Sequence, residues 1–351
     1  MLGLILKRLG QGLLVIWGIV SLLFLIFYVS GDPTDYLVED NADAETKAAI
    51  RAKYGLDQSV GVQYLNYLNQ LSPIGTLDSL DQEDVSHLAL FSFSNQTVFA
   101  FKVPGLGRSF QSNAPVARLV GQRLEGTIIL AGSAILFAGL LGIFLGVIAS
   151  LNKGKFWDQF ILSISVVGIS APSFFMGVLI AWLFAIKGQD WTGLSVSGYM
   201  FEANIFSEGR HLVLKNLLLP MIALGIRPLS VFIQLTRSSM IEALSSDYVR
   251  TAKSKGLSST KIVLNHALRN ALNPVLTSLT NWLASLLAGA FFIEYIFNWQ
   301  GIGKLTIDAL NQQDFPVIMG CSLFIGLIFV LINIITDILY SVLDPRVKLA
   351  E

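Results

Sequence analysis

The sequence carries little charge. Asp, Glu, Lys and Arg make up 14% of its 351 residues, and hydrophobic residues make up 53%. Soluble globular proteins usually contain about 25% charged residues, and the mean hydropathy here is +0.63. Too few polar side chains are present to cover the folded chain in water, so we expect lipid to solvate part of its surface. The 24 basic and 24 acidic residues cancel, which leaves no basic excess to indicate nucleic-acid binding.

Cysteine and histidine are also scarce. The single cysteine, Cys321, excludes an internal disulfide and a thiolate metal site, and the three histidines lack metal-ligand spacing. The run Gly301–Lys304 resembles part of a phosphate-binding loop, but residue 298 is Asn and residue 305 is Leu, so that motif fails. We therefore expect no metal, no cofactor and no enzymatic activity in this chain itself.

Long apolar stretches are present instead. We place six spans, at about Leu9–Val29, Gly126–Ser150, Phe156–Ile186, Leu212–Leu235, Leu272–Phe297 and Phe315–Leu343. Each is long enough as a helix to cross a hydrocarbon core of about 30 Å. The first is longer than the apolar part of a signal peptide, and no small-residue cleavage site follows it, so we expect an uncleaved span. The predicted fold is an all-α integral membrane protein with six transmembrane helices.

The basic residues predict the orientation of these spans. With both termini in the cytoplasm, half of the 24 lysines and arginines fall on short cytoplasmic segments. They are Lys7, Arg8, Lys153, Lys155, Arg237, Arg250, Lys253, Lys255, Lys261, Arg269, Arg346 and Lys348. The segment 31–125 is rich in acids, so we expect it to lie outside the cytoplasm.

The chain then divides into three parts. Residues 1–30 form the N-terminal tail and the first transmembrane helix, residues 31–125 an extracytoplasmic domain, and residues 126–345 a core with the other five helices. In the outer domain we predict helices at Ala44–Tyr54 and Val60–Leu71, and a hairpin within residues 87–101. A polar loop is predicted between the third and fourth spans, at about Lys187–His211.

One segment of the core, residues 237–271, is too polar to cross a membrane and too regular to be a simple linker. We predict a helix–turn–helix at the cytoplasmic surface. Its first helix would continue from the fourth span and end at Gly256, because glycine readily adopts the left-handed conformation of a helix C-cap.

The turn after Gly256 has its own signals. Ser258 or Ser259 would cap the second helix, and with Ser258 as the cap, Leu257 and Ile262 occupy the positions of a hydrophobic staple. The small side chain of Ala252 would leave room for a partner to approach. The turn is therefore expected to present a rigid surface.

One pattern within this segment carries a family resemblance. It consists of Asp247, Tyr248, Val249, Arg250, Thr251, Ala252, Lys253, Ser254, Lys255, Gly256, Leu257 and Ser258, followed by the run His266–Ala271. This pattern resembles the signature loop of ABC importer permeases, most closely in the dipeptide, oligopeptide and nickel branch. The general signature has Glu-Ala-Ala, three residues and Gly, and later Ile-x-Leu-Pro. The glycine and its spacing match, whereas the Glu and the Pro are absent, as is common in the peptide branch.

Further matches to this branch occur in the same order along most of the chain. They are Gly31–Pro33, Tyr54–Asp57 with Gln63 and Tyr64, Leu106–Phe110, Ala171–Phe174, Glu294–Gly303 and Asp344–Arg346. The region Thr76–Lys102 departs from the branch and looks like an insertion in the outer domain.

The resemblance implies a function and a set of partners. It implies a permease subunit of an ATP-driven importer for short peptides in the bacterial inner membrane, with nickel complexes or other small solutes as alternative substrates. A second, homologous permease subunit would complete the translocation path, and an extracytoplasmic binding protein would deliver the substrate. ATP hydrolysis would occur on two ATPase subunits or domains. The segment Asp247–Leu257 would dock onto them as a coupling helix.

Other functions stay open. A stand-alone secondary transporter or channel would need intramembrane acids or an inverted repeat, and neither is clear in the sequence. A membrane enzyme would need a catalytic constellation. The basic loop 237–271 could also be an ordinary segment that binds anionic lipid.

Several residues within or near the spans are candidates for the path or for packing. A charge at this depth is costly, so Arg227 is expected to face the translocation path or to pair with an acid. Pro172 is expected to bend the third span, and we place it with Arg227 among the candidate path residues. Glu294 is expected to form a structural pair or cap, and the closely spaced glycines of the second span to pack helices.

Overall fold

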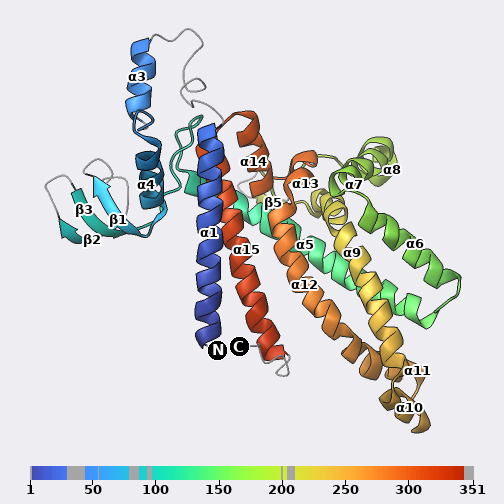
Figure 1. The fold of residues 1–351 in the computed structure, drawn as a ribbon. Helices are drawn as coiled ribbons and strands as arrows, with labels where there is room; N and C mark the ends of the chain where they lie inside the picture. Colours follow the sequence, from blue (N-terminus) through green and yellow to red (C-terminus); the bar gives the residue numbers. More distant parts are fainter. Residues whose placement is uncertain are drawn as a thin grey trace. The chain divides into compact units, whose positions relative to one another are not determined.

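The computed structural model describes residues 2–29, 44–53, 55–78, 87–92, 97–198, 201–203 and 210–343. These residues are mostly helical (Figure 1). The acidic cluster at 32–43 and the C-terminal motif at 344–346 lie outside the described residues. The chain forms two compact units, one from Met1–Arg123 with Leu305–Leu327 and the other from Leu124–Lys304 with Ile328–Glu351.

The first unit combines helices with a small sheet. Its elements are α1 (Leu2–Val29), α3 (Ala44–Lys53), α4 (Val60–Leu71), β1 (Ile74–Asp78), β2 (His87–Ser92), β3 (Thr97–Lys102), the start of α5 (Val116–Leu151), most of α14 (Ile302–Asn311) and the start of α15 (Phe315–Leu343). The antiparallel strands have the order β1-β3-β2. The predicted helices and the hairpin are confirmed. The third strand, β1, was not predicted, because it has only five residues and a glycine, so the expectation of an all-α protein is wrong here.

Aromatic rings join α1 to α4 within this unit. The ring of Phe24 lies 5.1 Å from that of Tyr64 and 6.0 Å from that of Tyr67. The hydroxyls of Ser21 and Tyr64 are 2.6 Å apart and share a hydrogen bond. Burial raises the pKa of Tyr67, which lies in α4, to about 12. The second predicted outer helix is therefore anchored on the first apolar helix.

The motif at Leu106–Phe110 has a structural role in the first unit. Asp314 immediately precedes α15, and its carboxylate accepts a hydrogen bond from the Ser109 hydroxyl at 2.5 Å and one from the Phe110 backbone N–H at 3.0 Å. Both Ser109 and Asp314 are buried. Because a buried carboxylate must be compensated, these bonds fix the approach to α5 against the start of α15.

The second unit contains most of the long helices. Its elements are the rest of α5, α6 (Phe156–Ser170), α7 (Ser173–Ile180), the π-helix η1 (Ala181–Lys187), α8 (Gln189–Thr192), β4 (Phe201–Ala203), β5 (Arg210–Leu212), α9 (Leu214–Ser245), α10 (Asp247–Ser254), α11 (Ser259–Lys261), the π-helix η2 (Ile262–Leu268), α12 (Arg269–Gly289) and α13 (Phe291–Ile296). The region predicted as a polar loop at Lys187–His211 thus contains α8 and the paired strands β4 and β5.

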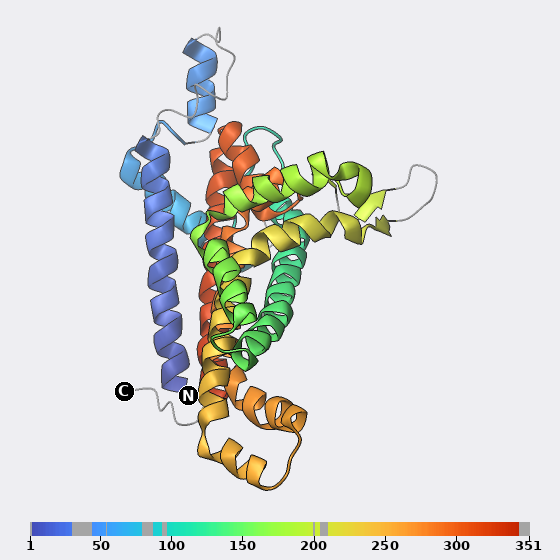
Figure 2. The same cartoon turned by 90° about the vertical axis from the view of Figure 1, so that its right-hand side faces the viewer.

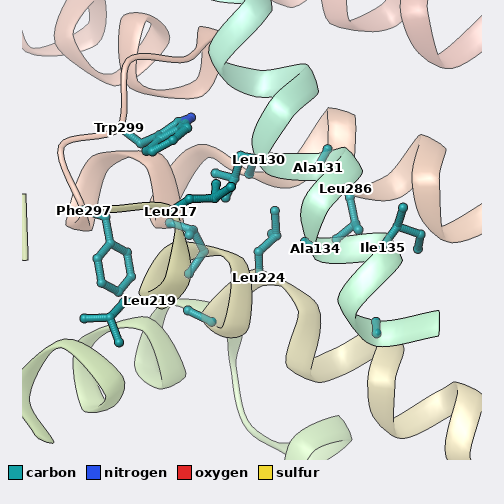
Figure 3. Packing of buried hydrophobic residues seen from close by; sticks show 14 of the residues in the cluster. Leu130, Ala131, Ala134, Ile135, Leu217, Leu219, Leu224, Leu286, Phe297 and Trp299 are labelled. Carbon is teal, nitrogen blue, oxygen red and sulfur yellow. The ribbon is translucent and has the colours of Figure 1, made fainter. Parts of the chain in front are cut away.

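The core of this unit is formed by side chains from α5, α7, α9 and α12. Leu130 and Ala134 of α5 pack with Leu224 of α9 and Leu286 of α12 (Figure 3). The indole of Trp299 closes one end and donates a hydrogen bond to the Gly126 carbonyl at 2.7 Å. The apolar faces of four helices therefore meet in one cluster.

Small residues allow α5 and α9 to approach closely. A Cβ added at Gly142 would lie 2.7 Å from the Cβ of Phe232, and one at Gly146 would lie 2.9 Å from the Ile233 carbonyl oxygen. No real side chain tolerates such distances, so glycine is required at both positions. The expected packing role of these glycines is confirmed.

Four of the six predicted spans form single long apolar helices in the described residues. In the described residues, four helices are long and apolar enough to cross a membrane, namely α1, α5, α9 and α15. A fifth span results if α6 and α7, which are bent by 111°, are counted together. The fifth predicted span forms α12 and α13 with a break at Ala290, and α12 is too polar to satisfy the same criterion. These helices are thus those of a multi-pass membrane protein.

The third predicted span is broken rather than gently bent. Ala171 and Pro172 are both extended, with ψ values of 135° and 138°. Proline disfavours the helical conformation at the residue before it and cannot donate a backbone hydrogen bond. The helix therefore ends at Ser170 and restarts at Ser173.

Glu294 caps a helix, as the sequence indicated. Its buried carboxylate accepts hydrogen bonds from the Thr127 hydroxyl at 2.8 Å and from the backbone N–H groups of Gly303 and Lys304, the latter at 3.0 Å. These N–H groups lie in the first turn of α14, where backbone donors have no partner within the helix. A Cβ at Gly301 would collide with this carboxyl group, which explains the glycine of the Glu294–Gly303 motif.

Candidate functional site: the helical loop between α9 and α12

The loop that joins α9 to α12 lies at one end of the second unit. α9 and α12 run side by side, and α10 and α11 form the turn between their ends (Figures 1 and 2). Met240 and Ala243 of α9 pack against Ala267 of η2 and Ala271 of α12. The base of the loop is therefore fixed by buried apolar contacts between the two helices.

The first helix of the loop does not continue from α9. The helix breaks at Ser246, which is extended with a ψ of 157° and whose hydroxyl bonds back to the Ala243 carbonyl at 2.5 Å. The expectation of one helix running to Gly256 is thus wrong. The short polar side chains of serine and aspartate can bond to nearby backbone groups in place of the regular helical hydrogen bonds. A helix therefore ends readily before the Ser246–Asp247 pair, and a new helix can begin there.

The end of α10 at Gly256 is a Schellman motif. Gly256 has a φ of +74°, its N–H bonds to the Lys253 carbonyl at 3.0 Å, and the Leu257 N–H bonds to the Ala252 carbonyl at 3.4 Å. These two bonds are the paired C-terminal closures that define the motif. The role predicted for Gly256 as a C-terminal stop is confirmed.

A small apolar core holds α10 against the segment after the turn. Val249, Ala252 and Ile262 are buried together, and Leu257 packs against them. Leu257 and Ile262 therefore make the staple contact expected for a helix that begins after Ser258. Ala252 belongs to this core, with 5% of its surface exposed. It is thus turned inward, and the expectation that its small size leaves room for a partner is wrong.

The outer surface of α10 is polar, with one aromatic side chain. Tyr248 is 41% exposed, and Thr251, Lys253 and Lys255 are also exposed. Asp247 and Arg250 form an exposed ion pair at 2.7 Å. The predicted site residues Asp247, Tyr248, Arg250, Thr251 and Lys253 therefore lie on the outer surface of α10. Ala252 and Leu257 instead belong to the apolar core beneath it.

An ion pair at the base of this loop was not predicted. Arg237 of α9 donates to both carboxylate oxygens of Asp158 in α6, at 2.5 and 2.8 Å, and Asp158 also accepts the Gly154 N–H at 2.8 Å. Asp158 is buried, and such bidentate pairs fix geometry as well as charge. The available signal was the single acid in the first turn of an otherwise apolar helix.

The two candidate path residues lie apart from the loop. Arg227 lies near the middle of α9, its side chain is exposed, and it has no ion-pair or hydrogen-bond partner within the described ranges. Pro172 lies at the break between α6 and α7. The expected acid partner for Arg227 is therefore not found in the described part of this chain.

Comparison with known proteins identifies the family. Residues 142–349 match the model described as "Binding-protein-dependent transport system inner membrane component", and residues 1–131 match the N-terminal model of the same kind of component. The chain belongs to this family. It is thus the membrane component of an ABC importer, a transport subunit rather than an enzyme, and its ATP is hydrolysed on a partner ATPase.

Curated relatives of this inner membrane component match over nearly the whole chain. The di/tripeptide transport system permease protein DppB of Pseudomonas aeruginosa is 34% identical over 364 residues, and the dipeptide transport system permease protein DppB of Escherichia coli K12 is 31% identical over 369 residues. A putative peptide permease protein of Brucella suis is 34% identical over 353 residues. Each comparison covers 99% of both chains. A solved amino acid ABC transporter has a TM-score of 0.46 and 17% identity over 66% of this chain and 95% of its own.

Proposed function

We propose that this subunit imports short peptides and that the loop 237–271 couples it to the ATPase. The peptide substrate is supported by the relatives, which are named for dipeptide, di/tripeptide or peptide transport. In the proposed assembly, a second permease subunit completes the path, two ATPase subunits bind on the cytoplasmic side, and an extracytoplasmic binding protein delivers the peptide. Both termini are cytoplasmic in this arrangement, in agreement with the positive-inside rule.

The proposed topology has six spans. They are α1, α5, the broken pair α6–α7, α9, α12 and α15. α12 is included because its 21 residues extend about 31 Å at 1.5 Å per residue, and because it lies against α9, which is apolar enough to span. The segment 31–125 then forms the extracytoplasmic domain, and residues 126–345 form the core.

The construction of the loop is the observation that carries the coupling role. α10 has its own apolar core, a fixed C-terminal stop and a polar outer face that includes an exposed tyrosine. Its base is tied to α6 by the Asp158–Arg237 pair. A rigid projection of this kind can transmit displacement of a bound partner to the spans, as a two-state coupling requires. An ordinary lipid-binding segment needs only positive charge.

We assign Arg227 and Pro172 to the translocation path. An unpaired arginine near the middle of a span is unfavourable in lipid, so a hydrated path or the partner subunit must face it. In the path, its guanidinium would bind the C-terminal carboxylate of a peptide. Pro172 breaks a helix at a point where two rigid segments can pivot.

The test targets the outer face of α10 and leaves its core intact. The double variant Tyr248→Ala with Thr251→Arg is expressed with its partners and purified in mild detergent. We expect the second permease subunit to be retained while the ATPase subunits and ATP-driven peptide uptake are lost. Trp191→Ala removes an aromatic side chain from α8 that is 76% exposed, and this matched control should retain the ATPase. Normal uptake by the double variant would overturn the coupling role, and a wild-type chain that purifies alone would favour a stand-alone carrier.

A further inference from the structure

We propose that one face of the small sheet β1-β3-β2 lies in the lipid interface of the extracytoplasmic leaflet and binds lipid there. The inference rests on the proposed topology, with α1 as a span, and not on the imported substrate. The aromatic face, as we call it, consists of Ile74, Phe91, Phe99 and Phe101. Phe91 lies opposite Phe99, and Ile74 lies opposite Phe101. Opposite residues share one face of an antiparallel sheet, as do residues two apart on β3, so the four side chains are neighbours.

The aromatic face is exposed within this chain. Phe91 is 70% exposed, Phe101 53% and Ile74 47%. The other face of the sheet carries Leu77 and Ala100, which are buried. An antiparallel sheet with one face in water normally alternates apolar with polar residues. A sheet with apolar side chains on both faces therefore requires an apolar environment for its outer face as well.

Asn69 of α4 fixes the sheet to this helix. Its side-chain amide donates to the Thr76 carbonyl, and its side-chain oxygen accepts the Thr76 N–H, both at 2.9 Å. A Cβ at Gly75 would collide with the same side chain. These bonds also satisfy two backbone groups of the edge strand β1, which would be costly to leave unpaired near lipid. The aromatic face is thus held in a fixed position relative to α4.

α4 packs beside the last turns of α1 (Figure 1). The rings of Tyr64 and Tyr67 lie against that of Phe24, and the Tyr64 hydroxyl shares a hydrogen bond with Ser21. α1 ends at Val29, so these contacts lie about 8 and 12 Å before its end at 1.5 Å per residue. Amphipathic helices at a membrane interface place their apolar side about 5–10 Å into the boundary between headgroups and acyl chains. α4 therefore lies level with the outer end of the span.

A second span gives the same level. The ring of Phe27 in α1 lies 5.1 Å from that of Phe315, the first residue of α15. The outer ends of both spans thus meet beside Phe27, only one turn beyond Phe24. Leu25 of α1 and Leu65 of α4 are both exposed. Apolar surface is therefore present on both helices at the level where the sheet is attached.

These observations favour lipid over a separate protein as the partner of the aromatic face. Phenylalanine and isoleucine side chains form no hydrogen bonds, whereas protein interfaces usually surround an apolar centre with a polar rim. Acyl chains need no such bonds, and a face fixed at the level of the span ends lies where acyl chains begin. The sheet thus gives the outer domain an attachment to the membrane in addition to α1.

Spin labels on the aromatic face test this assignment. Single cysteines replace Phe91 and Phe101 in a Cys321→Ala background of the full transporter, are labelled with a nitroxide and are studied in phospholipid vesicles. Oxygen concentrates in hydrocarbon and a polar metal chelate stays in water, so the ratio of their collision rates with the label reports immersion in lipid. Leu25→Cys on the exposed side of α1 is the immersed control, and Ala48→Cys on the exposed, charged helix α3 is the aqueous control. We expect the ratios at 91 and 101 to lie nearer to that at 25 than to that at 48.

A charged variant provides the second measurement. Phe101→Glu should lower the ratio of the label at position 91 to that of the aqueous control, because a carboxylate is unfavourable among acyl chains. Phe101→Leu is the matched control and should leave the label immersed.

Three outcomes would overturn the proposal. They are ratios at 91 and 101 equal to that of the aqueous control, labels shielded from both reagents by the partner permease, and labels shielded only after the binding protein is added. The labels are read without peptide, ATP or binding protein, so a failure of import does not alter the result. Immersed labels in a transporter without ATP-driven peptide uptake would contradict the proposed function and support the lipid contact.

Discussion

Substitution of Gly256 is the most direct test of the loop, because only one effect, backbone strain, should raise the free energy of the variant. Gly256 has a φ of +74°, and a Cβ added there meets nothing within 4 Å among the described residues. Gly256→Ala therefore introduces no collision, only an L-residue in the left-handed region, at about 1 to 2 kcal/mol. If the strained free loop relaxes out of its native shape and the ATPase binds only that shape, the affinity should fall by up to the same free energy, or by up to about 5- to 30-fold.

The assay is the binding of purified ATPase subunit to the permease pair in detergent, followed by ATP-driven uptake in vesicles. Gly193→Ala is the matched control, because Gly193 has a φ of +63° and equally open space in the described structure, but it lies after α8. It should show the same local strain and unchanged ATPase affinity. Asparagine tolerates the left-handed region better than alanine, so Gly256→Asn should bind more tightly than Gly256→Ala. Equal affinity of wild type and Gly256→Ala would refute the reasoning.

Three further results are expected. Asp158→Asn leaves the Arg237 charge without its partner. Because Arg237 is partly exposed, the free energy of unfolding should fall by about 1 to 3 kcal/mol. An unchanged Tm in thermal unfolding would contradict this. In α5, Gly142→Ala should destabilise by about 1 to 3 kcal/mol through its contact with α9, whereas Gly132→Ala, with open space in the described structure, should not. Burial raises the pKa of Tyr67 to about 12, so burying the neutral phenol stabilises the folded state fully below pH 10, and this stabilisation is lost as the pH rises from 10 to 12. Tyr67→Phe should remove that part of the pH dependence of Tm.

Local signals predicted the loop's parts better than their arrangement. The stop at Gly256 and the staple of Leu257 with Ile262 follow from residue types at fixed spacings, which short-range backbone geometry determines. The inward position of Ala252 depends on which side of α10 packs against the segment after the turn. That side is the one in contact with Ile262, which comes ten residues later in the chain. Likewise, the Asp158–Arg237 pair joins residues 79 positions apart, and nothing near either residue indicates the other.

Two of the six predicted spans, α12 with α13 and the α6–α7 pair, are not single apolar helices, and the reason is the same for both. Hydropathy measures how a segment would partition into lipid by itself, but α12 and the α6–α7 pair are placed by their neighbours. Proline breaks the latter while α9 packs against both halves, and α12 packs Val275 and Leu286 into the core while Asn273 and Asn281 are exposed. A helix that packs against other helices can carry more polar residues than one that faces lipid on every side. The polarity that removes α12 from a count of apolar helices is therefore compatible with its proposed place among the six spans.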